Sequence, residues 1–288
     1  MRVTKTAMRL FLLTALTMAA FAANSVLNRA AVGSFGMDAI TFGAIRLTSG
    51  ALALALLIVW QRRGFALGGW GRGVAVLGLL AYIFGFSLAY RGLESGLGAL
   101  ILFGVVQITM FGGAVLAREE MPMARWLGAG LALGGLIWLL APGASDTGGA
   151  AVALMPAVAM AAAGVGWGVY SLQGRQERDA TQATAMNFML AAPIALMGAL
   201  WMSDSAALSM GGVTLAVISG VLTSGMGYAL WYAILPALGA SRAAVAQLTV
   251  PVIAMAGGML FLAEPLTWRF VGAAALVIGG VLVSMRRA

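Results

Sequence analysis

The sequence predicts an all-α integral membrane protein with ten transmembrane helices, arranged as two inverted five-helix repeats. Hydrophobic residues make up 62% of the 288 residues and charged residues 9%. So few charged groups cannot cover the surface of a soluble domain, and the chain therefore belongs in a lipid bilayer. Turn and charge signals divide it into ten apolar segments, and the second half of the chain repeats a pattern of the first.

Each apolar segment is long enough, or nearly so, for the roughly 20 residues that a membrane-spanning helix needs. A β-barrel would instead show polar and apolar residues in alternation, whereas these segments are apolar throughout. The predicted spans, in chain order, are Met8–Asn28, Ala39–Trp60, Gly73–Tyr90, Leu93–Leu116, Trp126–Ala141, Ala150–Leu172, Thr181–Met202, Val213–Leu235, Ser241–Leu262 and Leu266–Met285.

The two halves of the chain, residues 1–144 and 145–288, are predicted to be copies of one five-helix unit. The stretch Gly85–Tyr90 has a counterpart in Gly227–Tyr232, and a longer echo at a spacing of 144 pairs Glu120 with Glu264, among others. Because five is an odd number, the second copy enters the membrane from the opposite side. Inverted repeats of this kind are a common basis for alternating access around a site near the membrane midplane.

The distribution of positive charge predicts that both termini are cytoplasmic, since short loops rich in Lys and Arg stay on that side. With the N-terminus inside, 13 of the 17 Lys and Arg residues fall in cytoplasmic positions. The first apolar segment is interpreted as the first helix and not as a cleaved leader, because it aligns with the start of the second half. Six tryptophans at span ends match the interfacial preference of indole rings.

Composition also excludes several functions. The chain has no Cys and no His, so thiolate chemistry, imidazole bases and the usual zinc sites are unavailable. No Asp pair, Ser-His pair or metal-ligand cluster lies within a span, which argues against an intramembrane enzyme and against a bound cofactor or metal. The net charge of +8 does not indicate nucleic-acid binding, because the Arg residues stand singly between apolar runs. The expected partners are a small-molecule substrate and the lipid bilayer, with the protein a monomer or weak dimer.

The sequence resembles the EamA branch of the drug/metabolite transporter (DMT) superfamily. The resemblance rests on the two five-helix halves, the Gly-rich fifth helix of each half, and the turn Glu264–Thr267 with its degenerate partner Glu120–Pro122. Within the branch the chain is most similar to the YddG-type exporters of aromatic amino acids. The resemblance implies a multi-pass exporter of a bacterial inner membrane with a central cavity. One departure is Phe21-Ala22 in the first helix, where the family often has Trp-Gly, as at Trp167-Gly168 here.

Three groups of aromatic residues are candidates for the wall of such a cavity. They are Tyr82, Phe86 and Tyr90 at i, i+4 and i+8 of the third span, Trp167 and Tyr170 in the sixth, and Tyr228, Trp231 and Tyr232 in the eighth. Such rings could bury an aromatic side chain and hold an ammonium group by cation–π attraction. The alternative is plain packing. Tyr82 is the strongest binding candidate because of its depth, whereas Tyr90 and Tyr232 lie at opposite span ends and are candidates for two gates.

Polar residues within the spans form the second set of candidates, since each would be costly against lipid. They are Asn24, Arg46, Gln107, Asn187 and Gln247. They either contact substrate or hydrogen-bond neighbouring helices together. Arg46 meets a substrate carboxylate or is a structural strut held by backbone carbonyls and Asn groups; its uncharged repeat partner, Asn187, favours the strut.

The predicted function is export of small amphipathic metabolites, in particular aromatic or apolar amino acids, by alternating access. All nine acidic residues map to loops or span ends, so transport is expected without obligatory proton coupling. The alternatives are a multidrug or organic-cation exporter and a non-transporting membrane scaffold or subunit.

Overall fold

The structure is a computed structural model. It describes residues 2–62, 64–65, 69, 71–116, 118, 122–140, 154–174, 177, 179–202 and 208–284. Within these ranges the regular structure is entirely helical. The helices, in chain order, are α1 (Arg2–Arg29), η1 (Ala30–Ser34), α2 (Ala39–Trp60), α3 (Gly71–Ala89), α4 (Ser95–Leu116), α5 (Met123–Leu140), α6 (Leu154–Gly174), α7 (Ala180–Met202), α8 (Met210–Ile218), η3 (Ser219–Met226), α9 (Gly227–Gln247), α10 (Thr249–Leu262) and α11 (Trp268–Ser284).

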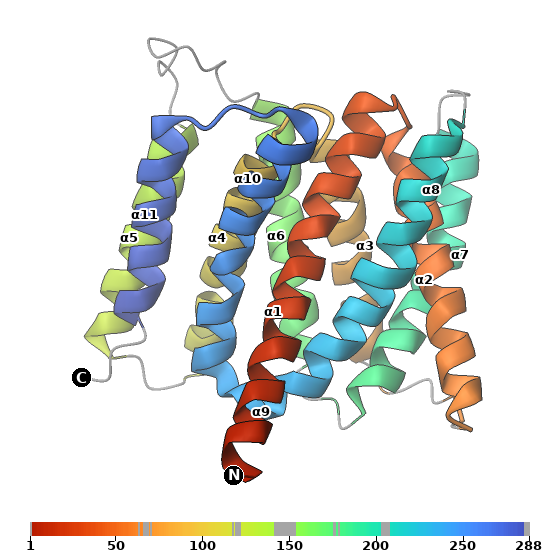
Figure 1. The fold of residues 1–288 in the computed structure, drawn as a ribbon, viewed down its shortest axis with the longest axis horizontal. Helices are drawn as coiled ribbons and strands as arrows, with labels where there is room; N and C mark the ends of the chain where they lie inside the picture. Colours follow the sequence, from red (N-terminus) through yellow and green to blue (C-terminus); the bar gives the residue numbers. More distant parts are fainter. Residues whose placement is uncertain are drawn as a thin grey trace.

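The long helices stand side by side as one bundle, with the start of α1 and the end of α11 at the same end of it (Figure 1). Among the described residues, seven helices are long and apolar enough to cross a membrane, and the described parts of α5, α10 and α11 are shorter apolar helices. These seven and three overlap with the ten predicted apolar segments. Residues 141–153, around the predicted start of the sixth span, lie outside the described residues.

The outer surface of the bundle is apolar, as expected for contact with lipid. Leu56 on α2 and Leu200 on α7 are 70% and 79% exposed. Trp201 and Trp268, at the ends of predicted spans, are 83% and 85% exposed, which fits the position of amphipathic indoles at a membrane interface. Trp70, one of the six interfacial candidates, lies outside the described residues.

The region of the eighth and ninth predicted spans differs from the prediction. The eighth span is three consecutive helices, α8, η3 and the first part of α9, and the predicted loop before Ser241 is helical, because α9 continues to Gln247. In Figure 1, α9 crosses the end of the bundle before the chain turns back into α10. A helix satisfies most of its own backbone hydrogen bonds, which favours it over an open turn despite the turn-forming tendency of Pro236 and Gly239. Pro251 lies in the first turn of α10, where proline is tolerated, and not in mid-helix.

The most extensive contact between two helices joins α3 to α6, elements from different halves of the chain. A Cβ atom added to Gly78 would lie 2.8 Å from the Gly166 carbonyl oxygen, and one added to Gly166 would lie 2.6 Å from the Gly78 carbonyl oxygen. The two backbones therefore touch, as small residues allow in membrane helices. This contact sets Tyr82, one turn beyond Gly78, beside Trp167.

Other helices also pair across the two halves. Helix α2 packs against α7, α5 against α11, and α4 against both α10 and α6, while α1 packs against α9, α10 and η3. The central helices α1, α3, α4, α6 and α9 together surround the site described below.

Candidate functional site

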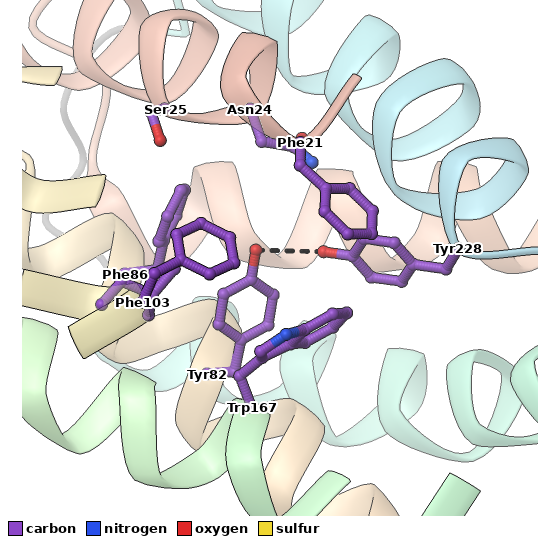
Figure 2. A pocket seen from close by; sticks show the side chains of 9 residues that line it. Phe21, Asn24, Ser25, Tyr82, Phe86, Phe103, Trp167 and Tyr228 are labelled. Carbon is purple, nitrogen blue, oxygen red and sulfur yellow. Dashed lines mark hydrogen bonds between the residues drawn. The ribbon is translucent and has the colours of Figure 1, made fainter. Parts of the chain in front are cut away.

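A small cavity lies among the central helices (Figure 2). Its volume is about 10 Å³. That is room for about one water molecule, so this conformation encloses a site but cannot hold an organic ligand without rearrangement. The lining residues are Phe21, Asn24 and Ser25 of α1, Tyr82 and Phe86 of α3, Leu102 and Phe103 of α4, Trp167 of α6 and Tyr228 of α9.

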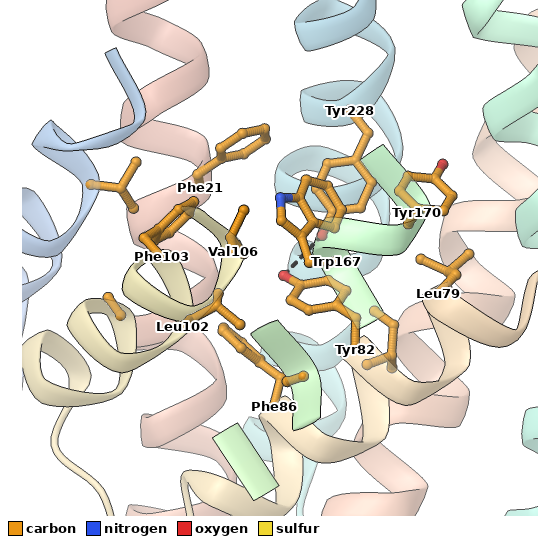
Figure 3. Packing of buried hydrophobic residues seen from close by; sticks show 14 of the residues in the cluster. Phe21, Leu79, Tyr82, Phe86, Leu102, Phe103, Val106, Trp167, Tyr170 and Tyr228 are labelled. Carbon is orange, nitrogen blue, oxygen red and sulfur yellow. Dashed lines mark hydrogen bonds between the residues drawn. The ribbon is translucent and has the colours of Figure 1, made fainter. Parts of the chain in front are cut away.

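Trp167 is the centre of the aromatic wall (Figure 3). Its ring centroid lies 4.8 Å from that of Tyr82 and 4.8 Å from that of Tyr228. Phe21 meets Trp167 edge-on at 5.9 Å. All four rings are at most 5% exposed. Rings at these separations gain pairwise attraction beyond area burial, so the wall has a defined arrangement and is not a loose apolar surface.

The guanidinium of Arg46 lies behind this wall. Its side chain is fully buried, with 0% exposure. Nε donates to the Ser224 hydroxyl at 2.7 Å, and one terminal nitrogen donates to the hydroxyls of Tyr228 at 2.9 Å and Tyr82 at 3.1 Å. The two tyrosine hydroxyls also bond each other at 3.0 Å, as Figure 2 shows. Arg46 thus reaches two residues of the cavity wall through direct hydrogen bonds.

The partners of Arg46 differ from those expected of a strut. Its described partners are three hydroxyl groups, not backbone carbonyls or Asn groups, and no carboxylate of the described residues forms an ion pair with it. Its ring neighbours are Tyr82 and Phe86, with centroids 5.3 and 5.2 Å from the guanidinium carbon. Hydroxyls and rings stabilise a buried cation only in part, so Arg46 keeps an uncompensated positive charge.

Helix η3 reaches Arg46 because Gly220 lets it pack against α2. A Cβ atom at Gly220 would lie 2.3 Å from the backbone oxygen of Arg46. The same helix presents three hydroxyls to Asn24: the Asn24 Oδ1 atom accepts from Ser219 at 2.8 Å, from Ser224 at 3.3 Å and from Thr223. Its amide nitrogen donates to the Thr223 backbone oxygen at 3.1 Å. Asn24 therefore joins α1 to η3, and its acceptor atom is fully occupied.

The predicted site residues fall into three groups in the structure. Those that line the cavity are Asn24, Tyr82, Phe86, Trp167 and Tyr228, with Arg46 directly behind them. Those that pack near it without lining it are Tyr90, 4.7 Å from Phe86, and Trp231, 5.7 Å from Phe21. The remaining four, Gln107, Asn187, Tyr232 and Gln247, are not among the lining residues.

Two of these four residues contact other side chains, and the other two are only partly buried. Asn187 accepts a hydrogen bond from Arg72 at 3.0 Å at the end of the bundle where α3 begins. Tyr232 packs 6.2 Å from Tyr170 near the end of α6. Gln107 and Gln247 are only partly buried, unlike Asn24, Arg46 and Asn187. The position of a polar residue along its helix did not predict whether its side chain faces the centre or the edge of the bundle.

At one end of the bundle, Glu264 links the two halves of the chain. Its carboxylate accepts from the Ser95 backbone nitrogen at 2.8 and 2.9 Å and lies 3.6 Å from Arg29 Nε. Arg29 in turn donates to the Tyr90 backbone oxygen at 3.0 Å, and the Tyr90 hydroxyl donates to the Ser95 backbone oxygen at 3.2 Å. The ends of α1, α3, α4 and α10 are thereby joined over the cavity.

A second cluster joins the helices at the opposite end. Arg72, at the start of α3, pairs with Glu177 at 2.9 Å and donates to the Ala183 backbone oxygen at 3.1 Å. These contacts, with that to Asn187, hold α3 to α7. Tyr170 and Tyr232 are buried beside them, at 1% and 7% exposure. The described helices are therefore tied together by polar contacts at both ends of the bundle in this conformation.

The Glu264 cluster makes stability depend on pH. Burial raises the pKa of Glu264 above its usual 4.5, against the opposing effect of Ser95 and Arg29. Burial also raises the pKa of Glu94, and the charge of Glu264 adds to that rise. A raised pKa in the folded state means that stability is fully present below the unfolded pKa and declines as pH rises through the folded pKa.

We therefore expect the melting temperature to fall as pH is raised from 4.5 towards neutrality, and the Glu264→Gln variant to show a shallower fall. The variant removes one titrating group and also relieves Glu94 of a neighbouring charge. Thermal unfolding of the detergent-purified protein across this pH range measures both slopes. Equal slopes in the two proteins would contradict the assignment of this pH dependence to Glu264.

Several residues of the cavity were not singled out from the sequence as binding candidates. Leu102 and Phe103 lie in an apolar run that gives no signal of which face turns inwards. Ser25 lies next to Asn24 and carries no separate signal. Phe21 was recognisable in principle, because it aligns with Trp167 at a spacing of 146 between the two halves. Ser224 is a small hydroxyl residue that carries no separate signal in the sequence, yet it is the closest hydrogen-bond partner of Arg46.

Comparison with known proteins places the chain among transporters. Residues 153–286 match the EamA-like transporter family. An uncharacterized protein of Pseudomonas aeruginosa, PA1977, is 45% identical over 275 residues, which are 95% of this chain and 93% of the relative. Uncharacterized transporters of Archaeoglobus fulgidus and of Bacillus subtilis (YoaV) are 24% and 23% identical, over 87% and 88% of this chain and 90% and 89% of their own lengths.

A protein of known crystal structure shares the fold, with a TM-score of 0.68 over 94% of this chain and 97% of its own, at 20% identity. At that identity the likeness concerns the fold alone. The relatives match nearly the whole chain, and the apolar helices of the structure suit a multi-pass membrane protein. The chain therefore belongs to the EamA-like transporter family of the drug/metabolite transporter superfamily.

Proposed function

We propose that the protein exports small amphipathic metabolites, with aromatic and apolar amino acids as the leading class, by alternating access around the cavity at Trp167. The observation that carries this proposal is an aromatic cavity at the centre of the bundle, backed by a buried cation, with a separate polar cluster joining the helices at each end of the bundle. A scaffold protein has no need of such a cavity.

The proposed mechanism uses residues 1–144 and 145–288 as two inverted five-helix repeats. The helix contacts support it: α2–α7 and α5–α11 each join corresponding helices of the two halves, and α3–α6 corresponds to the packing of α9 and η3 on α1. Rocking of one half against the other would break the Glu264 cluster in one state and the Arg72 cluster in the other. With both termini in the cytoplasm of a bacterial cell, the Glu264 cluster closes the outer side.

We further propose that transport does not require a proton gradient. Among the described residues no carboxylate lines the cavity, and the acids with raised pKa values, Glu94 and Glu264, lie at the ends of helices. A carrier coupled to protons normally keeps a titratable group along the substrate path. The organic-cation alternative is disfavoured by Arg46, whose charge lies next to the cavity wall and repels a second cation.

The Tyr82→Ala variant tests the cavity assignment. We expect export to fall at least about tenfold, because the variant removes a ring that contacts Trp167 and a hydroxyl that bonds Arg46. Phe111→Ala is the matched control: Phe111 packs against Trp126 on α5, away from the cavity. Flux of radiolabelled amino acids from proteoliposomes, with and without an imposed pH gradient, is the measurement.

Unchanged flux in Tyr82→Ala across a panel of amino acids, cationic dyes and neutral metabolites would remove the cavity from the transport path. Flux in the wild-type protein that depends strictly on the pH gradient would reject the uncoupled mechanism. No flux of any panel member would favour the scaffold alternative.

A further inference from the structure

We propose that the site behind the aromatic wall is a carboxylate subsite, and that the preferred ligand is an amphipathic monocarboxylate whose aromatic or apolar body replaces the ring contacts of the cavity while its anionic group binds Arg46, Tyr82 and Tyr228. This inference rests on the proposed export of small amphipathic metabolites, and within that class it puts carboxylates without an amino group ahead of the amino acids. It further predicts that an aromatic carboxylate without an amino group binds better than the corresponding amino acid.

The charge of Arg46 is the first observation. The side chain is fully buried, and its described partners are hydroxyl groups that carry no charge. A guanidinium cannot lose its charge under physiological conditions. Burial of an unpaired ion is unfavourable, so an anion that binds here is favoured by the neutralisation of an existing charge. A monoanion achieves this neutralisation, whereas a zwitterion leaves the net charge of the site unchanged.

The balance of hydrogen-bond donors is the second observation. The Nη1 atom of Arg46 is buried without a hydrogen-bond partner among the described residues, and so is the indole Nε1 atom of Trp167 in the cavity wall. The Tyr82 and Tyr228 hydroxyls together have two hydrogens, of which one lies between the two oxygens. Arg46 has no acceptor atom, so it cannot take up the second hydroxyl hydrogen, which is available to a ligand. A carboxylate, which accepts through two oxygens, matches this excess of donors.

Acceptors for an ammonium group are the third consideration. The amide oxygen of Asn24, which lines the cavity, already accepts from three hydroxyls. No carboxylate side chain lies among the lining residues. The amino group of an amino acid would therefore lie near the guanidinium with only ring faces and hydroxyl oxygens around it. Loss of its hydration would not be offset by a charged partner.

The size of the cavity shows which contact must change. At about 10 Å³ it admits no ring, so a ligand has to separate the residues that fill it. The Tyr82 and Tyr228 hydroxyls contact each other at 3.0 Å in the cavity wall (Figure 2), and both accept hydrogen bonds from Arg46. Separation of these two hydroxyls by a carboxylate would keep Arg46 bonded to both tyrosines through the ligand and give its free Nη1 atom a partner.

The test uses four ligands that share a phenyl ring and differ in their polar groups: 3-phenylpropanoate, 3-phenylpropanamide, L-phenylalanine and 2-phenylethylamine. Binding to the full-length protein in lipid nanodiscs is measured by calorimetry, and counterflow is measured in proteoliposomes. We expect 3-phenylpropanoate to bind at least about tenfold more tightly than the other three, a difference of about 1.4 kcal/mol. The amide is the control for shape without charge.

The Arg46→Gln variant should lose this preference, so that acid and amide bind within about twofold of each other. Arg46→Lys keeps the charge but not the forked donors and should retain part of the preference. Arg269→Gln, at the peripheral α11, is the matched control and should keep it. The comparison among the four ligands in the wild-type protein stands even if Arg46→Gln fails to fold.

Equal or tighter binding of the amide or the amine would overturn the carboxylate subsite while leaving the proposed transport function intact. Equal or tighter binding of L-phenylalanine would overturn the predicted preference for a ligand without an amino group. An unchanged preference in a folded Arg46→Gln variant would overturn the carboxylate subsite as well. Preferential binding of 3-phenylpropanoate without counterflow would support the subsite and count against transport.

Discussion

Replacement of Trp167 by Ala is expected to abolish transport and to lower stability by about 3 to 5 kcal/mol, the usual range for removal of a large buried aromatic side chain. Trp167 is 3% exposed and contacts Phe21, Tyr82, Tyr170 and Tyr228 at once. Its removal leaves four rings without their common neighbour and enlarges a cavity that has room for about one water molecule. Both the binding geometry and the packing between α1, α3, α6 and α9 depend on it.

The matched control is Trp201→Ala. Trp201 is 83% exposed at the end of α7, so its loss should change the free energy of unfolding by less than about 1 kcal/mol and leave flux within about twofold of wild type. Denaturation in detergent gives the stability, and efflux from proteoliposomes gives the function. A Trp167→Ala protein that unfolds like the wild type would mean that the aromatic wall contributes little to the fold.

Trp167→Phe separates the packing of the indole ring from hydrogen bonding by its Nε1 atom. Phenylalanine keeps a ring within reach of Tyr82 and Tyr228 but lacks the Nε1 donor, which has no partner in this conformation among the residues that the structure describes. We expect most of the stability to return, since an atom without a partner contributes no hydrogen bond to the folded state. A remaining defect in substrate affinity would then report a hydrogen bond that forms only with ligand bound.

The extent to which the sequence predicted the fold follows from the physics of the bilayer. Lipid requires that each crossing segment satisfy its own backbone, so apolar runs became helices close to the predicted ends, as in Ala39–Trp60. The loop predicted before Ser241 was wrong for a related reason. A helix satisfies most of its backbone hydrogen bonds, and at the bundle end no contact required the backbone of α9 to leave the helical state. Turn propensity at Pro236 and Gly239 was the weaker influence.

The candidate site was predictable where one helix carries the signal. Tyr82 and Phe86 share a face by their spacing of four, and both line the cavity. The surroundings of Arg46 were not predictable, because its partners Ser224 and Tyr228 lie 178 and 182 residues away and reach it only through the packing of η3 on α2. Hydroxyl residues are common in membrane helices, and their sequence positions do not reveal which of them will meet a buried charge.

Substitution of Gly166 by Ala is expected to have the second large effect, although it adds a single methyl group. The new Cβ atom would lie 2.6 Å from the Gly78 carbonyl oxygen and 2.8 Å from the Tyr82 backbone nitrogen, and neither backbone atom can move aside as a flexible side chain can. Helices α3 and α6 must separate, which costs about 1 to 3 kcal/mol for overpacking of this kind. Their separation also displaces Tyr82 from Trp167, so affinity should fall together with stability.

Gly134→Ala in α5 provides the control, since a Cβ atom there would meet no atom within 4 Å. The same substitution in an open helical position should leave stability unchanged or raise it by up to about 1 kcal/mol, because alanine favours the helix more than glycine does. Opposite shifts of the melting temperature in the two variants are therefore expected. If Gly166→Ala melted at the wild-type temperature, the direct backbone contact of α3 with α6 would be refuted, and with it the argument that this contact sets the geometry of the aromatic wall.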